Sequence, residues 1–446
     1  MTSCTTHASA NYDAGSLSSM HYSSIPSDYE LQSVIVVTRH GDRAQISKEL
    51  GPNYPQDPNI EKIWETKLPT KSTLGAMYSV ANTDSPLPSD SSFILSESLK
   101  KKIEDHISHE LYTGWDAIKS PYAQLTELGS QQLIAVGKEL RRRYVGKLLP
   151  KTLGEAVDML YCRSTNICRT MQSLRSLLVG LYDTHTECEH DNEAIMSIKK
   201  QGLLHHLVPT IETRPRTKET LFPQADGPSP AVTKRRLEIF PNDYLINHFP
   251  GYSELEKKVG QIFGFTEKAI NWLTVKEVLT CYSVHNIELP NSITLKDVEK
   301  ITDLVGFMWG RIYGDDELNR LAIGRFIREM ISDLESSLSE SQLSCHVKML
   351  LYSGHDSTLV PLLCALGIYD GVWPLYASYI TIETVICRNS DKKKVRVTYN
   401  DKDQIIKGAD NIWCDYEVFM NRMKKMSISR VEYNMLSAGE ALPDDI

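Results

Sequence analysis

The sequence predicts an α/β protein, in which a central, mainly parallel sheet is flanked by helices and interrupted by a mostly helical insertion. Three stretches far apart in the chain carry this prediction, at 33–43, 157–165 and 347–356. Each begins as a short, apolar run typical of a strand buried on both faces, and each ends in polar residues. Ligands of open α/β sheets bind beyond the carboxyl ends of the strands, so the three polar ends are expected to converge on one site.

The first of these strands, Ser33–Thr38, runs directly into Arg39-His40-Gly41-Asp42-Arg43. The planar forks of two arginines suit a phosphate group. A neutral imidazole can attack phosphorus and form a covalent intermediate, which makes His40 the candidate nucleophile. Gly41 allows a sharp turn. The alternative reading is that this pentapeptide is a solvated surface patch.

The other two strand ends supply the groups that phosphoryl transfer to a histidine still needs. Arg163 is expected to complete the phosphate clamp, and His355 to donate a further hydrogen bond to the phosphate. Asp356 is the candidate proton donor, which would protonate the leaving alkoxide and later activate water. This set requires neither a metal nor a cofactor.

The remaining elements follow from local patterns along the chain. Residues 1–30 are poor in aliphatic side chains and are expected to be disordered. Prolines break 45–121 into loops and short helices. Thr126 can cap a helix that ends near Tyr144, with cations in its last turn. A long helix is expected over 318–338, and strands over 379–386 and 395–399 form a hairpin.

The insertion is predicted from a change of character in the middle of the chain. Residues 190–317 hold several short helical patterns and proline-containing breaks, and so read as a helical cap. The catalytic α/β core is therefore expected to comprise 31–189 and 318–446. Aromatic residues of the cap are more often its own core than contacts to a lipid tail or a sugar.

The three strand ends resemble the signatures of the histidine acid phosphatases, branch two of the histidine phosphatase superfamily. The resembling motifs are Arg39-His40-Gly41-x-Arg43, Arg163-Ser164-Thr165 and His355-Asp356. Leu125-Thr126-x-x-Gly129-x-x-Gln132 looks like the family's first long helix. The stretches Arg163–Ile167 and Leu366–Pro374 look most like the branch of lysophosphatidic acid phosphatases of type 6. One departure is Gln45, which stands where the family usually has proline.

The resemblance implies a phosphoglycerate mutase-like sheet and a cofactor-free acid phosphatase that acts through a phosphohistidine on His40. Its implied substrate is a small phosphomonoester, with lysophosphatidic acid suggested by the nearest branch. Two alternatives stay open. One is an inositol polyphosphate phosphatase, whose pocket should be broader and more basic. The other is a non-catalytic phosphate-binding scaffold, although His40 and Asp356 are both present.

Composition limits the partners and the compartment. The net charge of −8 argues against nucleic acid or an anionic membrane as a standing partner. No run approaches the length of a membrane helix. No Lys or Arg precedes Arg39, so no secretory or mitochondrial leader is recognised and a cytoplasmic location is expected, although the type 6 branch is associated with mitochondria. The nine cysteines are expected to be free thiols; by resemblance to extracellular members, pairing of Cys387 or Cys414 stays open.

Overall fold

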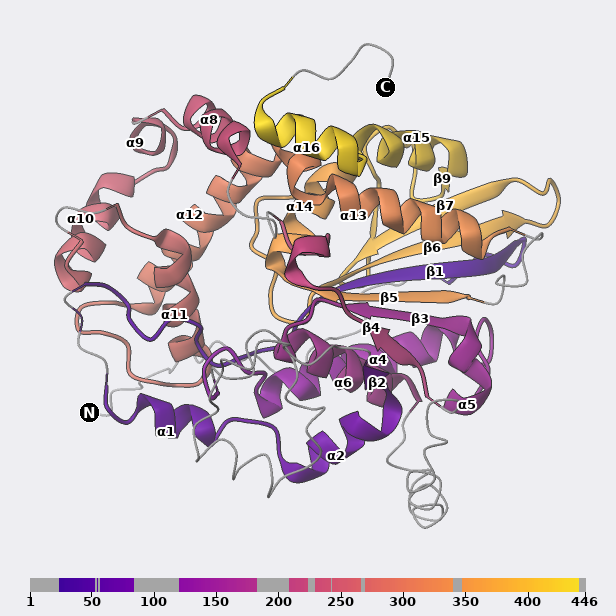
Figure 1. Ribbon diagram of the computed structural model, residues 1–446, viewed down its shortest axis with the longest axis horizontal. Coiled ribbons are helices and arrows are strands. Elements are labelled where there is room, and N and C mark those ends of the chain that lie inside the picture. The colour runs from indigo at the N-terminus through magenta and orange to yellow at the C-terminus, as the bar shows by residue number, and fades with distance from the viewer. Residues whose placement is uncertain are drawn as a thin grey trace, which may run out of the picture.

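The fold is described from a computed structural model of the chain (Figure 1). It describes residues 24–52, 54, 57–83, 120–182, 208–223, 229–241, 243–265, 269–339 and 347–440. Most of the predicted disordered lead lies outside these ranges. Tyr29 and Glu30, which the prediction placed in that lead, instead begin the first strand.

One mixed sheet forms the centre of the molecule, in the order β2-β4-β3-β5-β1-β6-β7-β8, with β9 also paired to β7. The five strands from β2 to β1 are mutually parallel, and β6 to β9 run antiparallel. The strands are β1 (Tyr29–Arg39), β2 (Asn82–Thr83), β3 (Leu160–Ser164), β4 (Thr210–Glu212), β5 (Met349–Gly354), β6 (Tyr379–Cys387), β7 (Lys393–Tyr399), β8 (Lys402–Gln404) and β9 (Cys414–Asp415).

Side-chain alternation along β1 divides the core into two layers. Val34 and Val36 pack with helices α4 (Glu127–Tyr144) and α6 (Cys168–Tyr182) on one face. Ile35 and Val37 pack on the other face with α13 (Asp316–Ser337), α14 (Asp356–Leu366) and α15 (Tyr416–Met426). The two helical layers lie below and above the sheet in Figure 1. Burial on both faces explains why β1 shows no polar alternation.

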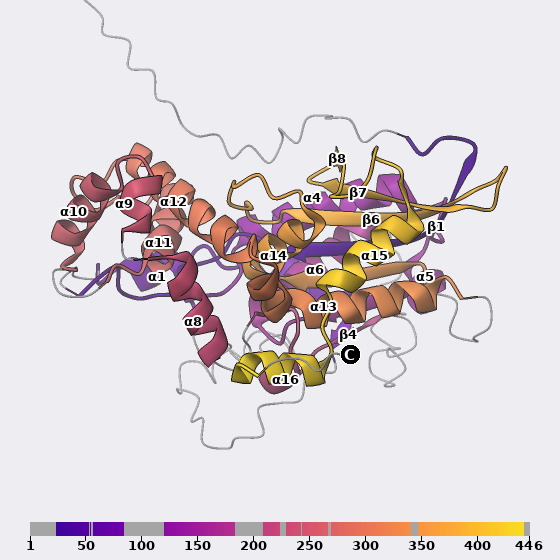
Figure 2. The ribbon, with the colours of Figure 1, turned by 90° about the horizontal axis from the view of Figure 1, so that it is seen from above.

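A third apolar cluster builds a helical cap beside the carboxyl edge of the sheet (Figure 2). Its helices are α10 (Tyr252–Phe263), α11 (Trp272–Val284) and α12 (Leu295–Tyr313), preceded by α8 (Pro230–Ile239) and α9 (Tyr244–His248). The structure revises the predicted cap limits in two places. β4 belongs to the sheet although it lies within 190–317, and α1 (Ile60–Glu65) contributes Ile60 and Trp64 to the cap core.

The sequence patterns located the strands that carry the predicted site residues, and the long helices near 126–144 and 318–338, to within a few residues. The predicted mixed α/β fold is confirmed, as is the hairpin of β6 with β7. Thr126 caps α4 by accepting from the Gly129 amide at 3.1 Å. The predicted strand at 157 begins later, because Val157–Met159 forms a 3₁₀ turn. The remaining helices in the described residues are α2 (Lys71–Val80), α5 (Leu153–Ala156), the 3₁₀ turn Arg216–Lys218 and α16 (Arg430–Ala438).

Candidate active site

Parallel pairing brings the predicted strand ends together. β1 and β3 flank β5, so that Arg39 is opposite Gly354 and Ser164 is opposite Ser353. The backbone amide of His40 donates to the carbonyl oxygen of Gly354 at 3.0 Å. The rings of His40 and His355 consequently lie with their centroids 5.4 Å apart.

The hydrogen bond made by His40 fixes which of its ring nitrogens can act as a nucleophile. Nδ1 lies 2.8 Å from the carbonyl oxygen of Gly41. A carbonyl oxygen only accepts, so Nδ1 carries the proton and Nε2 keeps its lone pair. The His40 ring is therefore held as the neutral tautomer that can attack phosphorus from Nε2.

The loop after His40 is locked against the start of α4. A Cβ on Gly41 would lie 2.2 Å from the carbonyl oxygen of Gly129, so no side chain fits at Gly41. The Asp42 carboxylate accepts from the Thr126 hydroxyl at 2.5 Å and lies 2.6 Å from Nε2 of the cap residue His285. Asp42 thus joins the loop, the core and the cap.

Gln45 holds the same loop by a different means from the family's usual proline. The residue is fully buried, and its side-chain oxygen accepts from Nε1 of Trp64 at 3.1 Å. Its amide nitrogen donates to the carbonyl oxygen of Ser47 at 2.8 Å. Two hydrogen bonds therefore take the place of a rigid ring at this position.

Arg39 and Asp356 lie side by side at the site. Nη2 of Arg39 lies 2.8 Å from Oδ2 of Asp356, and its Nη1 donates to the carbonyl oxygen of Pro374 at 2.5 Å. The guanidinium also lies over the Tyr376 ring, 4.3 Å from its centroid. Asp356 is the first residue of α14 and accepts from the Ser357 amide at 2.8 Å.

Arg43 is tied to the cap. Its guanidinium pairs with Glu277 of α11, and that carboxylate also accepts from the amide of Ile46 at 2.7 Å. Nε of Arg43 is buried and has no hydrogen-bond partner among the residues that the structure describes. The sequence patterns gave no role to Glu277, because its contact with Arg43 depends on how the cap folds back over the strand ends.

Arg163 does not lie at the site, and the prediction that it completes the phosphate clamp is corrected. Its guanidinium donates to Glu219 at 3.0 Å, Glu329 at 2.6 Å and Thr220 at 2.7 Å. Alternation along β3 sends Cys162 to one face of the sheet and Arg163 to the other, within the strand and short of its end. Glu219 and Glu329 therefore already neutralise the charge of Arg163.

Arg169 occupies the place predicted for Arg163. It lies in the first turn of α6, and its Nη2 lies 3.5 Å from Nδ1 of His355. Nε2 of His355 lies 3.0 Å from the hydroxyl of Thr165. Helix N-termini favour anions, and α6 begins directly beyond the end of β3. That position, in the first turn of the following helix, was the signal in the sequence that could have identified Arg169.

Burial and positive charge together keep both histidines neutral. Burial, followed by repulsion from Arg169, holds the pKa of His40 well below 6.5, and the same two causes act on His355. Burial opposes ionisation of Asp356, but Arg39 and then Lys276 outweigh it and lower the pKa of that carboxyl to about 2. The site therefore combines a neutral nucleophile with a cluster of cations.

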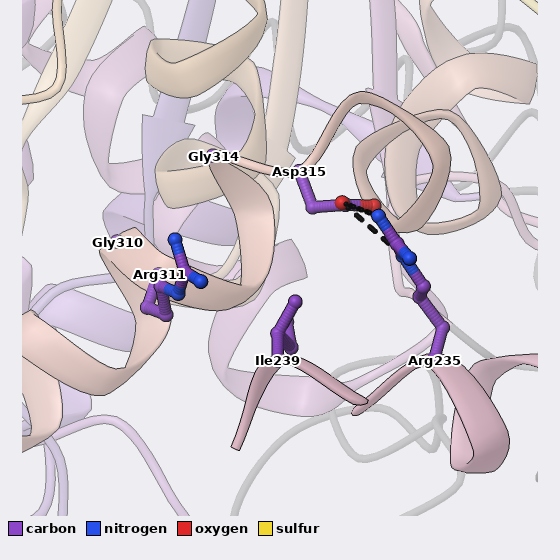
Figure 3. A pocket seen from close by; sticks show the side chains of 6 residues that line it. All are labelled: Arg235, Ile239, Gly310, Arg311, Gly314 and Asp315. Atoms are coloured by element: carbon purple, nitrogen blue, oxygen red, sulfur yellow. Dashed lines mark hydrogen bonds and ion pairs between the residues drawn. The ribbon is translucent and has the colours of Figure 1, made fainter. Parts of the chain in front are cut away.

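A separate pocket of about 340 Å³ lies where α8 meets the junction of α12 and α13 (Figure 3). Arg235 crosses it to pair with Asp315 at 2.6 Å. The Arg311 guanidinium lies 5.3 Å from the centroid of the Tyr244 ring. Both cations are thus already engaged, and the lining includes none of the residues predicted for catalysis.

Two other kinds of feature are absent from the described ranges. No group of three or more His, Cys, Asp or Glu side chains there is arranged to hold a metal ion. No helix in those ranges is both long and apolar enough to cross a membrane. The cysteines described as free thiols are Cys162, Cys168, Cys281, Cys364, Cys387 and Cys414.

The fold and the site define an α/β protein that places a neutral histidine among arginines at the carboxyl edge of its sheet. Comparison with known proteins gives the family. The profile of the histidine phosphatase superfamily, branch 2, matches residues 30–400, and the chain belongs to this family. Lysophosphatidic acid phosphatase type 6 of Bos taurus is 28% identical over 91% of this chain and 86% of its own length.

More distant relatives agree with this assignment. Human prostatic acid phosphatase is 27% identical over 58% of this chain and 64% of its own length. Among solved structures, the apo form of Hafnia alvei phytase superposes with a TM-score of 0.58, at 14% identity, over 91% of this chain and 98% of that one. At that identity the superposition supports the fold alone.

Proposed function

We propose that this protein is an acid phosphatase that hydrolyses phosphomonoesters through a phosphohistidine on Nε2 of His40. The observation that carries the proposal is the hydrogen bond from Nδ1 of His40 to the Gly41 carbonyl, which leaves Nε2 as the nucleophile. Arg39, Arg43 and Arg169 lie close enough to this ring to depress its pKa, and so surround the position of the phosphate.

In the first step Nε2 attacks phosphorus and the bond to the ester oxygen breaks. The three arginines stabilise the charge on the equatorial oxygens. Nδ1 of His355 accepts from the Arg169 guanidinium, so its Nε2–H donates to the Thr165 hydroxyl and His355 serves to position Arg169. The electron pair of the broken bond goes to the alkoxide, which takes a proton from Asp356. Because Arg39 lies 2.8 Å from Asp356, a phosphate dianion that binds Arg39 weakens its hold on that carboxylate and raises the pKa of Asp356.

In the second step water attacks the phosphohistidine. Asp356, now ionised, takes a proton from the water, the P–N bond breaks, and inorganic phosphate leaves with His40 regenerated as the neutral ring. Arg39 stabilises the ionised form of Asp356, so the same pair serves both the acid and the base role.

Lysophosphatidic acid is the substrate that the relatives' names support, because four relatives at 26–28% identity carry the name lysophosphatidic acid phosphatase type 6. Exposed apolar residues occur close in sequence to the site, at Ile46, Val372 and Leu375. Such side chains suit contact with an acyl chain. Inositol polyphosphate remains the second candidate, favoured by the extra cation that the cap brings to the site, Lys276.

The function is tested by phosphate release between about pH 4 and pH 8 from p-nitrophenyl phosphate, lysophosphatidic acid and myo-inositol hexakisphosphate. Wild type and His40→Ala are compared side by side. Release that disappears in His40→Ala supports the phosphohistidine mechanism, and the order of the substrates decides between the two candidates. Absence of release from all three compounds would instead favour a non-catalytic phosphate-binding protein.

A further inference from the structure

Lys276 is a buried lysine of the cap that lies beside the candidate active site. It immediately precedes Glu277, the partner of Arg43, on α11. Only 4% of the residue is exposed, and its Nζ lies 4.2 Å from the centroid of the Trp373 ring. Trp373 directly precedes Pro374, whose carbonyl oxygen holds Arg39. The cap therefore delivers an ammonium group to the place where Arg39 meets Asp356.

This ammonium group has no hydrogen-bond acceptor among the described residues. Its one contact of defined geometry is with the face of Trp373. An ammonium can donate three hydrogen bonds, and a contact with a ring face uses none of them. A fold that retains such a group at its reaction centre leaves it available to a ligand.

The charges around Lys276 define what that ligand must be. Arg39 and Arg43 repel the ammonium, whereas Asp356 and, more weakly, Cys281 attract it. Four cations, Arg39, Arg43, Arg169 and Lys276, thus gather at the site, and Asp356 and Glu277 are the carboxylates paired with Arg39 and Arg43. Protonation of Asp356, which gives the form that donates to the leaving group, removes the carboxylate charge that attracts Lys276. A second anionic group on the substrate would replace that attraction.

We propose that Lys276 binds an anionic group on the leaving alcohol, so that the enzyme prefers phosphomonoesters carrying a carboxylate or second phosphate close to the ester oxygen. The inference rests on the proposed function, because Asp356 marks the side of the leaving group. A lysophosphatidic acid carries a hydroxyl in that region and forgoes this ion pair. Lys276 is thus a specificity residue, distinct from the arginines that hold the scissile phosphate.

Two matched pairs of substrates test the proposal in the full-length protein. 2-Phosphoglycerate and glycerol 2-phosphate differ by a carboxylate, and ethylene glycol bisphosphate and 2-hydroxyethyl phosphate differ by a phosphate. We expect wild type to favour the more anionic member of at least one pair by about tenfold in kcat/KM at about pH 5.5. The pair that shows the preference identifies the anion. Lys276→Met should abolish the preference, and Lys276→Arg should restore it.

The preference should also depend on pH. Burial and repulsion from Arg39 lower the pKa of Lys276 to about 7, so in wild type the preference should fade as pH rises past that value. It should persist at about pH 9 in Lys276→Arg, because arginine stays charged. Lys257→Met, which replaces an exposed lysine on the cap helix α10, is the control and should match wild type.

Binding separates this proposal from the proposed function. Calorimetric titration of His40→Ala with the same compounds measures recognition without turnover, so a preference there supports Lys276 even if wild type hydrolyses nothing. Equal affinity and equal kcat/KM within both pairs in wild type would overturn the proposal. So would a Lys276→Met variant in which both members of each pair lose activity by the same factor, since Lys276 would then act only through Asp356.

Discussion

Nη2 of Arg39 lies 2.8 Å from Oδ2 of Asp356, so a residue proposed to bind phosphate is paired directly with the proposed proton donor. In the proposed mechanism this pair couples the two steps of the reaction. A bound phosphate would compete for Arg39 and make Asp356 easier to protonate, and departure of phosphate would restore the carboxylate. Binding and proton transfer therefore depend on one shared guanidinium.

Substitutions of the two proposed catalytic residues, His40 and Asp356, should have different effects on the kinetics. His40→Ala should lower kcat at least about 10³-fold for every phosphomonoester, because no covalent step remains. Asp356→Asn should cost about 10²–10⁴-fold with alkyl phosphates, which need an acid. With p-nitrophenyl phosphate, whose leaving group needs none, Asp356→Asn should release a burst of nitrophenol equal to the enzyme and then stall. If Asp356→Asn shows no burst and a normal steady-state rate, Asp356 has no role in the second step.

Arg169 and Arg163 form a matched pair of variants. Arg169→Ala should raise KM and lower kcat/KM by about 10²–10³-fold, because a charge against the phosphate is lost. It should also raise the pKa of His40, since Arg169 is the strongest of the charges that depress it. Arg163→Ala should chiefly lower the midpoint of thermal unfolding, since it leaves Glu219 buried without its cation. Similar kinetics in the two variants would contradict this assignment.

Activity should be greatest in acid. Burial and Arg169 keep the pKa of His40 well below 6.5, so the nucleophile stays neutral as pH falls through about 5. Rising pH removes the proton that Asp356 must donate, and kcat/KM for alkyl phosphates should decline. Steady-state rates with glycerol 2-phosphate over about pH 4–9 test this. A rate that climbs steadily to pH 9 would refute it.

Lys276 should lower stability near neutral pH. Its pKa falls from 10.5 to about 7 on burial, so the unfolded chain binds the proton more tightly and the folded state loses up to about 5 kcal/mol at pH 7. The penalty is complete below pH 7 and disappears as pH approaches 10.5. Lys276→Met should raise the unfolding midpoint in calorimetry at pH 7, with a smaller gain near pH 10. Lys257→Met should leave the midpoint unchanged at both pH values.

Gly41 and Gly129 lie too close together for either position to accept a side chain. A Cβ on Gly129 would lie 2.1 Å from the carbonyl oxygen of Asp42, which is backbone and cannot rotate away. Gly129→Ala should destabilise the protein by about 2–4 kcal/mol in urea denaturation and displace the His40 loop, with loss of activity. Gly154→Ala is the control, because no described residue lies within 4 Å of the position that its methyl group would take. Equal stability of the two variants would show that the loop adapts.

Local sequence determined the parts of this protein in which a few consecutive residues carry the whole signal. The apolar run before Arg39 and the run before His355 each specified a buried strand with its reactive residue at the end. Parallel pairing of β1 with β5 then placed His40 beside His355, because neighbouring parallel strands end at the same edge. Thr126 likewise specified the start of α4 by its own hydrogen bond.

Tertiary structure alone decided which arginine joins the site and what the cap contributes. Arg163 and Arg169 are six positions apart in the sequence, yet the pleat of β3 turns Arg163 toward Glu219 while the first turn of α6 presents Arg169 to His355. Lys276 and Glu277 reach the strand ends only because the cap folds over them. Strand and helix periods are local properties of the chain, whereas these contacts depend on packing between segments distant in sequence.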